Sequence, residues 1–307
     1  MTPDQAAIDP IVPEAGASPR TPAWARHLTT ALSLIVLGAV IWQLTHIDFA
    51  EMWRLMPTSP LFWLLFIASY MTGVGFDWIL FRRLWNLPPS GIIILLRKAV
   101  ANQILLDYAG EAYLYAWAKR NTGVTPAPFA AIKDVTLLSG LAGNFASVVL
   151  LALCWPYLHV LDLGSQVDGF VLSIIAVLAI SLGVIVFRGR VFSLPGCELR
   201  FIMAVHIIRI AVQLILTALL WLVLLPGTSA VWLLLLSTLR QLISRLPLLA
   251  NKDLPFAAAV VVLIGSQNNL TNAIALTAAL SMGAHIVVGL ALAVGGAWGT
   301  FAQFRRR

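Results

Sequence analysis

The chain has 307 residues, of which 60% are hydrophobic and only 11% are charged, and its mean hydropathy is +0.90. A chain of this composition needs a bilayer to cover its apolar surface, so composition excludes a soluble fold and predicts a polytopic membrane protein. The formal net charge is +7, but the Lys and Arg residues stand in short loops between apolar runs and form no basic domain. This distribution is typical of membrane orientation and argues against nucleic acid as a partner.

Six apolar segments are long enough to cross a membrane, because about 20 residues at 1.5 Å per residue match the hydrocarbon thickness. The predicted spans are residues 28–45, 61–81, 129–155, 169–187, 201–225 and 273–301. Residues 1–23 are rich in Pro and Ala and show no apolar periodicity, so we expect a disordered cytoplasmic tail there. Residues 24–307 are predicted to form a single integral membrane domain.

Two further apolar stretches, residues 91–118 and 231–270, are interrupted by polar residues before a span is complete. The first is broken by Asp107 and Glu111, about 24 Å into the segment at helical rise. Irregular backbone at membrane depth is tolerated only where protein or water surrounds it. We therefore predict an all-α, polytopic helical bundle with two broken, re-entrant helical hairpins.

The positive residues define an orientation. With both termini in the cytoplasm, fifteen of the twenty Lys and Arg residues fall on the cytoplasmic side and only Arg54 falls outside. The first hairpin then enters from the cytoplasmic side and the second from the opposite side, as in an inverted repeat. We expect a multi-pass protein of the bacterial cell (inner) membrane.

Charged residues left within the membrane part are the candidate functional residues, because an ionisable group in hydrocarbon is costly and has a function by default. Arg209 is the clearest case, since it lies near the centre of its span and would cost about 2.5–3.5 kcal/mol there unless paired or hydrated. His206, Arg209 and Gln213 share one helical face. The alternative is a shifted helix start that brings Arg209 to the interface.

The candidate residues of a polar cavity for a lipid headgroup are Asp107, Gly110, Glu111, Arg209, Arg240, Arg245, Lys252 and Asp253. Arginine binds two phosphate oxygens at once, which suits a phosphorylated headgroup. Asp77, in contrast, is interpreted as an interface residue or a local partner of Arg82 or Arg83.

Three small residues, Ser139, Gly143 and Ser147, recur every four positions and predict close packing of a neighbouring helix. His285 stands alone on an apolar face and is interpreted as a packing residue. The two cysteines have no neighbour at metal-ligand spacing, so we expect neither a metal nor another cofactor.

Two segments carry a resemblance to a known family. The first segment resembles the Gly-Glu segment of the lysylphosphatidylglycerol synthase transmembrane family. It consists of Asp107-Tyr108-Ala109-Gly110-Glu111, followed by Lys119-Arg120-Asn121-Thr122-Gly123 and an Ala-rich helix start at residues 129–132. Arg245-Leu246-Pro247 and the broken segment up to Ala259 resemble that family's second membrane-embedded turn. The resemblance extends from about Trp53 to Trp298. It implies a flippase-like integral membrane protein, without the aminoacyl-transferring domain that is fused to some members.

The function predicted from these features is binding or translocation of a membrane lipid with a phospholipid or polyprenyl-phosphate-type headgroup. Two alternatives stay open: a structural or accessory membrane subunit held by internal ion pairs, and a membrane transferase that uses a lipid carrier. The sequence does not decide whether the chain is an enzyme, but the absence of a phosphate loop or a metal-ligand motif favours a non-enzymatic role. The expected partners are a membrane lipid and either a second copy of the chain or a membrane enzyme.

Overall fold

The computed structural model describes residues 56–105, 107–120, 128–157, 191–245, 252–264 and 269–304. All of them belong to the compact unit Ile47–Arg307. Within these ranges the chain forms helices and no strand, so the predicted all-α class is confirmed. The predicted tail 1–23 and the predicted spans 28–45 and 169–187 lie outside the described residues.

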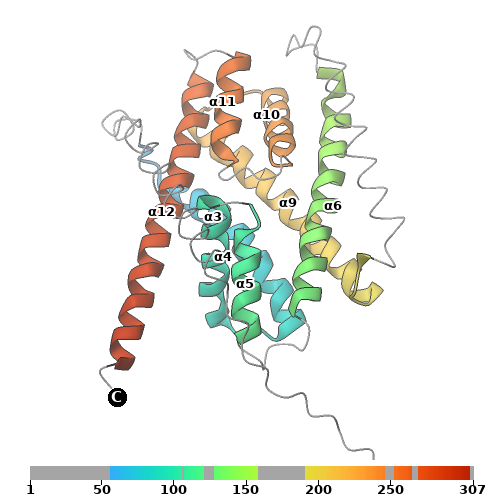
Figure 1. Cartoon of the computed structure of the whole chain (residues 1–307). Helices are drawn as coiled ribbons and strands as arrows, with labels where there is room; N and C mark the ends of the chain where they lie inside the picture. Colours follow the sequence, from blue (N-terminus) through green and yellow to red (C-terminus); the bar gives the residue numbers. More distant parts are fainter. Residues whose placement is uncertain are drawn as a thin grey trace, which may run out of the picture. The chain divides into compact units, whose positions relative to one another are not determined.

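The described elements, labelled in Figure 1, are α3 (Pro60–Trp85), η1 (Pro89–Gly91), α4 (Ile92–Ile104), α5 (Ala109–Arg120), α6 (Pro128–Cys154), α9 (Gly196–Leu224), α10 (Ala230–Ile243), α11 (Asp253–Ile264) and α12 (Asn269–Phe304). Helices α3, α6, α9 and α12 cover the predicted spans 61–81, 129–155, 201–225 and 273–301. Helix α9 begins five residues before its predicted span, because Pro195 at the N-cap and Glu198 in the first turn are typical of a helix start.

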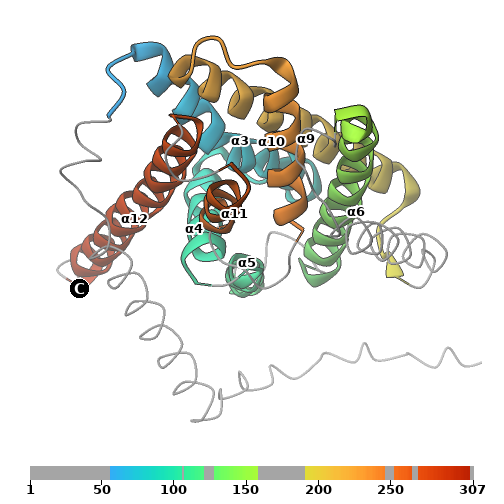
Figure 2. The same ribbon diagram turned by 90° about the horizontal axis from the view of Figure 1, so that it is seen from above.

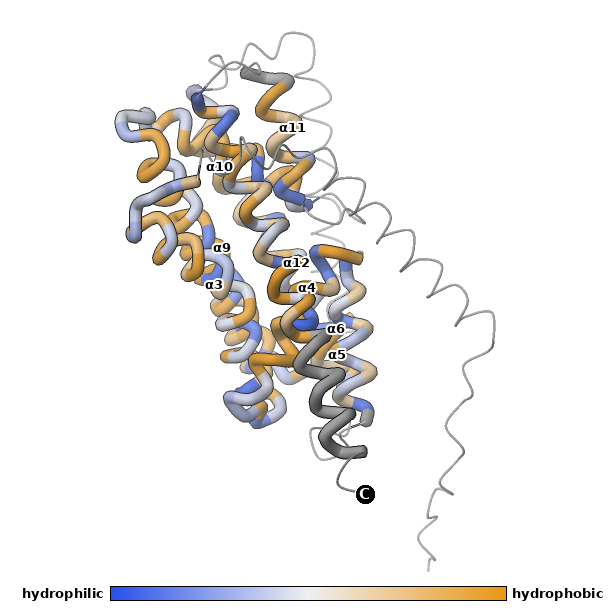
Figure 3. The backbone as a smooth tube through the Cα atoms, turned by 90° about the vertical axis from the view of Figure 1, so that its left-hand side faces the viewer, coloured by the Kyte–Doolittle hydropathy of each residue, from blue (hydrophilic) through white to orange (hydrophobic). Residues whose placement is uncertain are grey.

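The four long helices are apolar enough to cross a membrane, with mean hydropathies of 1.6 to 2.4 over their best 18-residue windows. Only 17 to 39% of the residues in these windows are buried inside the protein, and large side chains such as Leu64, Phe129 and Val287 point outward. Figure 3 shows hydrophobic residues recurring along the helices. Surfaces of this size and polarity are stable only against lipid, so the chain is a membrane protein.

The long helices pack around α9. Helix α3 lies against α9, and their contact is fixed at one end by Arg83, which donates two hydrogen bonds to Glu198 at 2.8 and 3.0 Å. Helix α6 also lies against α9, and its buried Asp134 accepts the backbone N–H groups of Ser193 and Leu194, both at 2.7 Å. Asp134 therefore fixes the chain just before α9 begins.

The two predicted broken hairpins are pairs of short helices. Helices α4 and α5 have 13 and 12 residues, and α10 and α11 have 14 and 12, so none has the length of a full span. Helix α4 packs against α5, and α12 packs against both α4 and α11, as the view from above shows (Figure 2). The turns of the two pairs meet, because Lys252 just before α11 donates to Asp107 just before α5 at 2.8 Å.

Two apolar cores hold these pairs in place. The first joins α3, α4, α5, α6 and α9 through residues such as Leu80, Leu95 and Leu114, all at most 1% exposed. The second joins α9, α10, α11 and α12, with Trp221 stacked on Phe256 at a ring distance of 5.8 Å. Each hairpin thus belongs to its own core, and the polar residues of both turns face a shared space.

Candidate functional site

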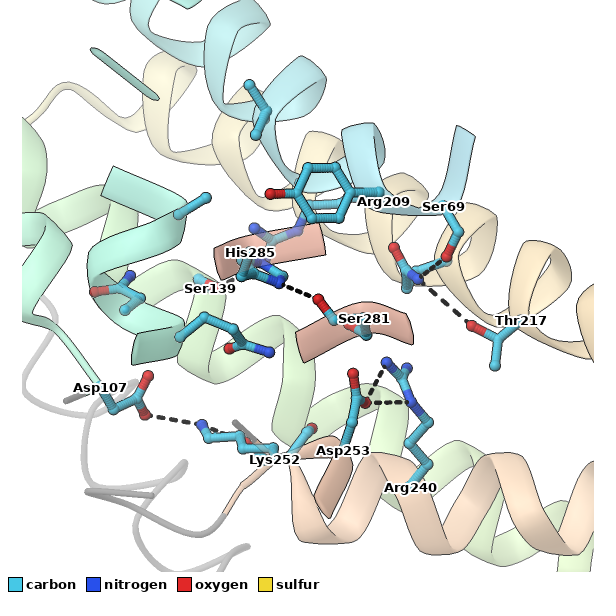
Figure 4. Close-up of a pocket in the computed structure, with 18 of the residues that line it drawn as sticks. Ser69, Asp107, Ser139, Arg209, Thr217, Arg240, Lys252, Asp253, Ser281 and His285 are labelled. Atoms are coloured by element: carbon cyan, nitrogen blue, oxygen red, sulfur yellow. Dashed lines mark hydrogen bonds and ion pairs between the residues drawn. The ribbon is translucent and has the colours of Figure 1, made fainter. Parts of the chain in front are cut away.

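A cavity of about 740 Å³ lies where the two hairpin turns meet (Figure 4). Side chains from α3, α4, α5, α6, α9, α10, α11 and α12, and from the turns of both hairpins, line it. Seven of the eight candidate residues are on its wall: Asp107, Glu111, Arg209, Arg240, Arg245, Lys252 and Asp253. The chain thus brings together charges that are as much as 146 positions apart in the sequence.

The eighth candidate, Gly110, is not among the residues that line the cavity. Its backbone N–H donates to Asn102 Oδ1 at 2.6 Å, and the amide of Asn102 donates to Glu111 at 2.9 Å. A Cβ atom at Gly110 would stand 2.1 Å from the carbonyl oxygen of Lys98. Glycine is needed here because α5 begins directly against the backbone of α4, and this contact aims Glu111 at the cavity.

The centre of the first hairpin is an ion cluster that the sequence interpretation missed. Lys98 Nζ lies 2.6 Å from Asp77 Oδ2 and 3.2 Å from Glu111 Oε1, and the Lys98 residue is 8% exposed. Asp77 also lies 3.7 Å from Arg209. One lysine and one arginine therefore neutralise two carboxylates contributed by two different helices.

This cluster corrects the interpretation of Asp77. The expected partners, Arg82 and Arg83, are five and six residues further along α3, outside the three- or four-residue spacing that places side chains on one helical face. Asp77 faces the protein interior, whereas Arg83 bonds Glu198. The sequence position of Asp77 indicates this role, since an ionisable residue inside a membrane span is by default a candidate for function.

Lys98 was overlooked for a different reason. In the sequence, Arg97 and Lys98 stand side by side and count among the fifteen cytoplasmic Lys and Arg residues, but adjacent helical residues point about 100° apart. Arg97 turns away from the cavity and contacts Tyr113 and the carbonyl of Leu292 at 3.4 and 3.3 Å. The spacing of four residues between Lys98 and Asn102 is the sequence signal that places both on the cavity side.

The second hairpin supplies its own charge pairs. Arg240 donates through Nε and Nη2 to Asp253 Oδ1 at 3.2 and 2.9 Å, joining the end of α10 to the start of α11 (Figure 4). Lys252 bonds Asp107 and also donates to the carbonyl of Ser244 at 2.9 Å. The Lys252–Asp107 pair connects the two hairpins, with side chains 26% and 19% exposed.

Helix α9 presents the predicted polar face to this cavity. His206 Nε2 lies 3.0 Å from the carbonyl of Val135, Arg209 Nη2 donates to Ser139 Oγ at 2.8 Å, and Gln213 donates to Ser69 Oγ at 2.7 Å. All three line the cavity, so the prediction of a shared face is confirmed. Arg209 lies 13 residues from the start of α9 and 15 from its end, about 20 Å from either end, so it stands near the middle of the helix.

Arg245 differs from the other cations of the cavity. Its Nε donates to Ser244 Oγ at 3.1 Å, and within the part of the chain that the structure describes it has no carboxylate within ion-pair distance. Its guanidinium lies against Gly143, where a Cβ atom would stand 1.8 Å from Nη1. Among the described residues, the guanidinium of Arg245 therefore lines the cavity without a carboxylate at ion-pair distance.

The small-residue stripe on α6 explains where Arg245 fits. Gln241 donates to the Gly143 carbonyl at 3.1 Å, and α10 packs against α6, as the stripe predicted. The same stripe also receives two guanidinium groups, that of Arg209 at Ser139 and that of Arg245 at Gly143. The small residues of this stripe therefore leave room both for α10 to approach α6 closely and for the guanidinium groups of Arg209 and Arg245.

The charged residues of the cavity do not balance. Among the described residues that line it, the cations are Lys98, Arg209, Arg240, Arg245 and Lys252, and the carboxylates are Asp77, Asp107, Glu111 and Asp253. Every one of these carboxylates has a cation within 4 Å. With both cavity histidines neutral, one positive charge remains in excess, and it is attributable to Arg245.

His285 also lines the cavity, from α12. Its Nδ1 lies 2.8 Å from the Ser281 carbonyl and its ring contacts that of Tyr70 at 4.7 Å. These contacts agree with the predicted packing role. Among the described residues, no group of three or more His, Cys, Asp and Glu side chains has the geometry of a metal site.

Comparison with known proteins identifies no relative: no family model, no curated protein and no solved structure matches the chain. Function must therefore be inferred from the cavity itself.

Proposed function

We propose that the protein binds the anionic headgroup of a membrane lipid in the cavity between its two hairpin turns and moves that headgroup across the bilayer. The observation that carries this proposal is Arg245, a cation on the cavity wall that has no carboxylate within ion-pair distance among the described residues. A guanidinium in this setting gains two charge-assisted hydrogen bonds from a phosphate. The cavity thus fits an anion better than it fits water.

The depth of the cavity favours a lipid over a soluble anion. Arg209 lies near the middle of α9, and helices α4 and α11 are about 20 and 18 Å long. We therefore assign the hairpin turns to the depth of the hydrocarbon core. A headgroup reaching this polar space can leave its acyl chains against the apolar outer surface. A flippase-like role is also what the resemblance of the Gly110-Glu111 and Arg245-Pro247 segments implies. The proposed role includes a location in the bacterial inner membrane, with both termini in the cytoplasm.

The structural alternative makes a different prediction about Arg245. Buried ion pairs that only fix helix register are neutral in total, and replacing their members by apolar residues is often tolerated. In that case the excess cation serves no purpose and its removal stabilises the fold. The transferase alternative requires a nucleophile or general base beside a donor site, and each carboxylate on the cavity wall is already held by a cation.

The test is native mass spectrometry of the detergent-purified protein, followed by lipid extraction. We expect one anionic lipid class to co-purify with the wild type and to fall at least about tenfold in Arg245→Gln. Gly143→Ala should weaken lipid binding by less, because its methyl group displaces the Arg245 guanidinium, the end of a flexible side chain, but leaves the charge in place. Arg200→Gln, which changes an exposed cation of α9, is the matched control.

Retention of the same lipids in Arg245→Gln and in the control would contradict the proposed function. A more stable Arg245→Gln protein with unchanged lipid content would favour the structural alternative.

A further inference from the structure

The geometry around Arg245 defines a site for one phosphate group. Ser139 and Gly143, which hold Arg209 and Arg245, are four residues apart on one face of α6, or about 6 Å at helical rise. This separation lets a single phosphate bond both guanidinium groups, since charge-assisted N–H···O bonds are about 2.8 Å long. Tyr108 and Asn144 also line the cavity.

The charge balance limits which phosphate fits. A single negative charge brings the described cavity residues to neutrality, whereas a phosphomonoester, which carries about −1.5 to −2 at pH 7, leaves an excess of negative charge. The chain between Arg245 and Lys252 contains no charged residue that would alter the count. A zwitterionic headgroup adds a cation beside Arg209 and Arg245, which already repel each other.

On this basis we propose that the cavity selects lipids whose headgroup is a phosphodiester with one negative charge, held between Arg209 and Arg245, and discriminates against phosphomonoester and zwitterionic lipids. This inference rests on the proposed function and names its substrate class.

The experiment measures lipid binding to the purified protein by native mass spectrometry with lipids that share dioleoyl chains. The lipids are phosphatidylmethanol, a phosphodiester with one charge and a minimal headgroup; phosphatidic acid, a phosphomonoester; and phosphatidylcholine, a zwitterion. We expect phosphatidylmethanol to bind at least about tenfold more tightly than the other two, because each of them leaves the cavity with an unbalanced charge. Arg245→Gln should remove this preference.

A charge-shifted variant makes the test sharper. Glu111→Gln keeps an acceptor for the amide of Asn102 but raises the excess charge of the cavity by one. We expect the preference to move toward phosphatidic acid. An unchanged order of affinities in Glu111→Gln would overturn the charge-balance argument even if the protein proves to bind lipid.

The outcomes separate the two proposals. Equal binding of phosphatidylmethanol and phosphatidic acid, both lost in Arg245→Gln, would overturn the selection of monoanions and leave the proposed lipid-binding function standing. Absence of binding by all three lipids would overturn both. Binding of soluble dimethyl phosphate as tight as that of phosphatidylmethanol would support the monoanionic phosphate site but overturn the assignment to a lipid.

Discussion

Replacing Lys98 by methionine tests whether the ion cluster of the first hairpin stabilises the fold. Methionine keeps most of the side-chain volume but leaves Asp77 and Glu111 without their closest cation, at 2.6 and 3.2 Å. Removing one partner of a buried ion pair costs about 3–5 kcal/mol. Asp77 keeps Arg209 at 3.7 Å and Glu111 keeps the amide of Asn102 at 2.9 Å, so the lower value, about 3 kcal/mol, applies.

The assay is thermal unfolding of the detergent-solubilised protein. A loss of about 3 kcal/mol corresponds to a fall in Tm of about 5 °C for a chain of 307 residues, at about 2.1 cal/mol/K of unfolding entropy per residue. Arg200→Met is the control, because it removes an exposed cation from α9. Adding Glu111→Gln to Lys98→Met should recover part of the loss, since Asp77 and Arg209 then balance each other.

A fall in Tm for Lys98→Met no larger than that for Arg200→Met would mean that the ion cluster does not stabilise the fold. Simple addition of the effects of Lys98→Met and Glu111→Gln would have the same meaning, because coupled charges in contact deviate from additivity.

Two further predictions concern how the hairpins are assembled. Gly110→Ala should destabilise the fold by about 1–3 kcal/mol, because its Cβ meets the backbone carbonyl of Lys98, which cannot move aside. Gly140→Ala is the control: its Cβ has open space around it, so this variant should be neutral or slightly stabilising in the same unfolding assay. Equal effects of the two substitutions would contradict the close approach of α5 to α4 at Gly110. Reversing either charge of the pair between the hairpin turns, with Asp107→Lys or Lys252→Asp, should lower stability by about 1 kcal/mol, and the double variant should restore it. Failure of the double variant to recover would mean that this pair does not join the turns.

The sequence was sufficient for the membrane class and for most element positions. Helices α3, α6, α9 and α12 follow from the length of their apolar runs, and the interruptions at Asp107 and around Arg240–Asp253 mark both hairpin turns. These features are local, because hydrophobic thickness fixes segment length and helical periodicity fixes which neighbours share a face. The shared face of His206, Arg209 and Gln213 is one such result.

Tertiary structure decided which charges meet. Asp77 and Lys98 are 21 residues apart on different helices, and no spacing rule relates them, so Asp77 was assigned to the wrong arginine and Lys98 was counted with the basic loops. The position of Arg245 depends on α10 lying against the small residues of α6, where Gly143 leaves room for its guanidinium. Apolar patterning sets how deep each segment lies, but only packing between distant helices determines whether a charge at that depth is paired or stays available to a ligand.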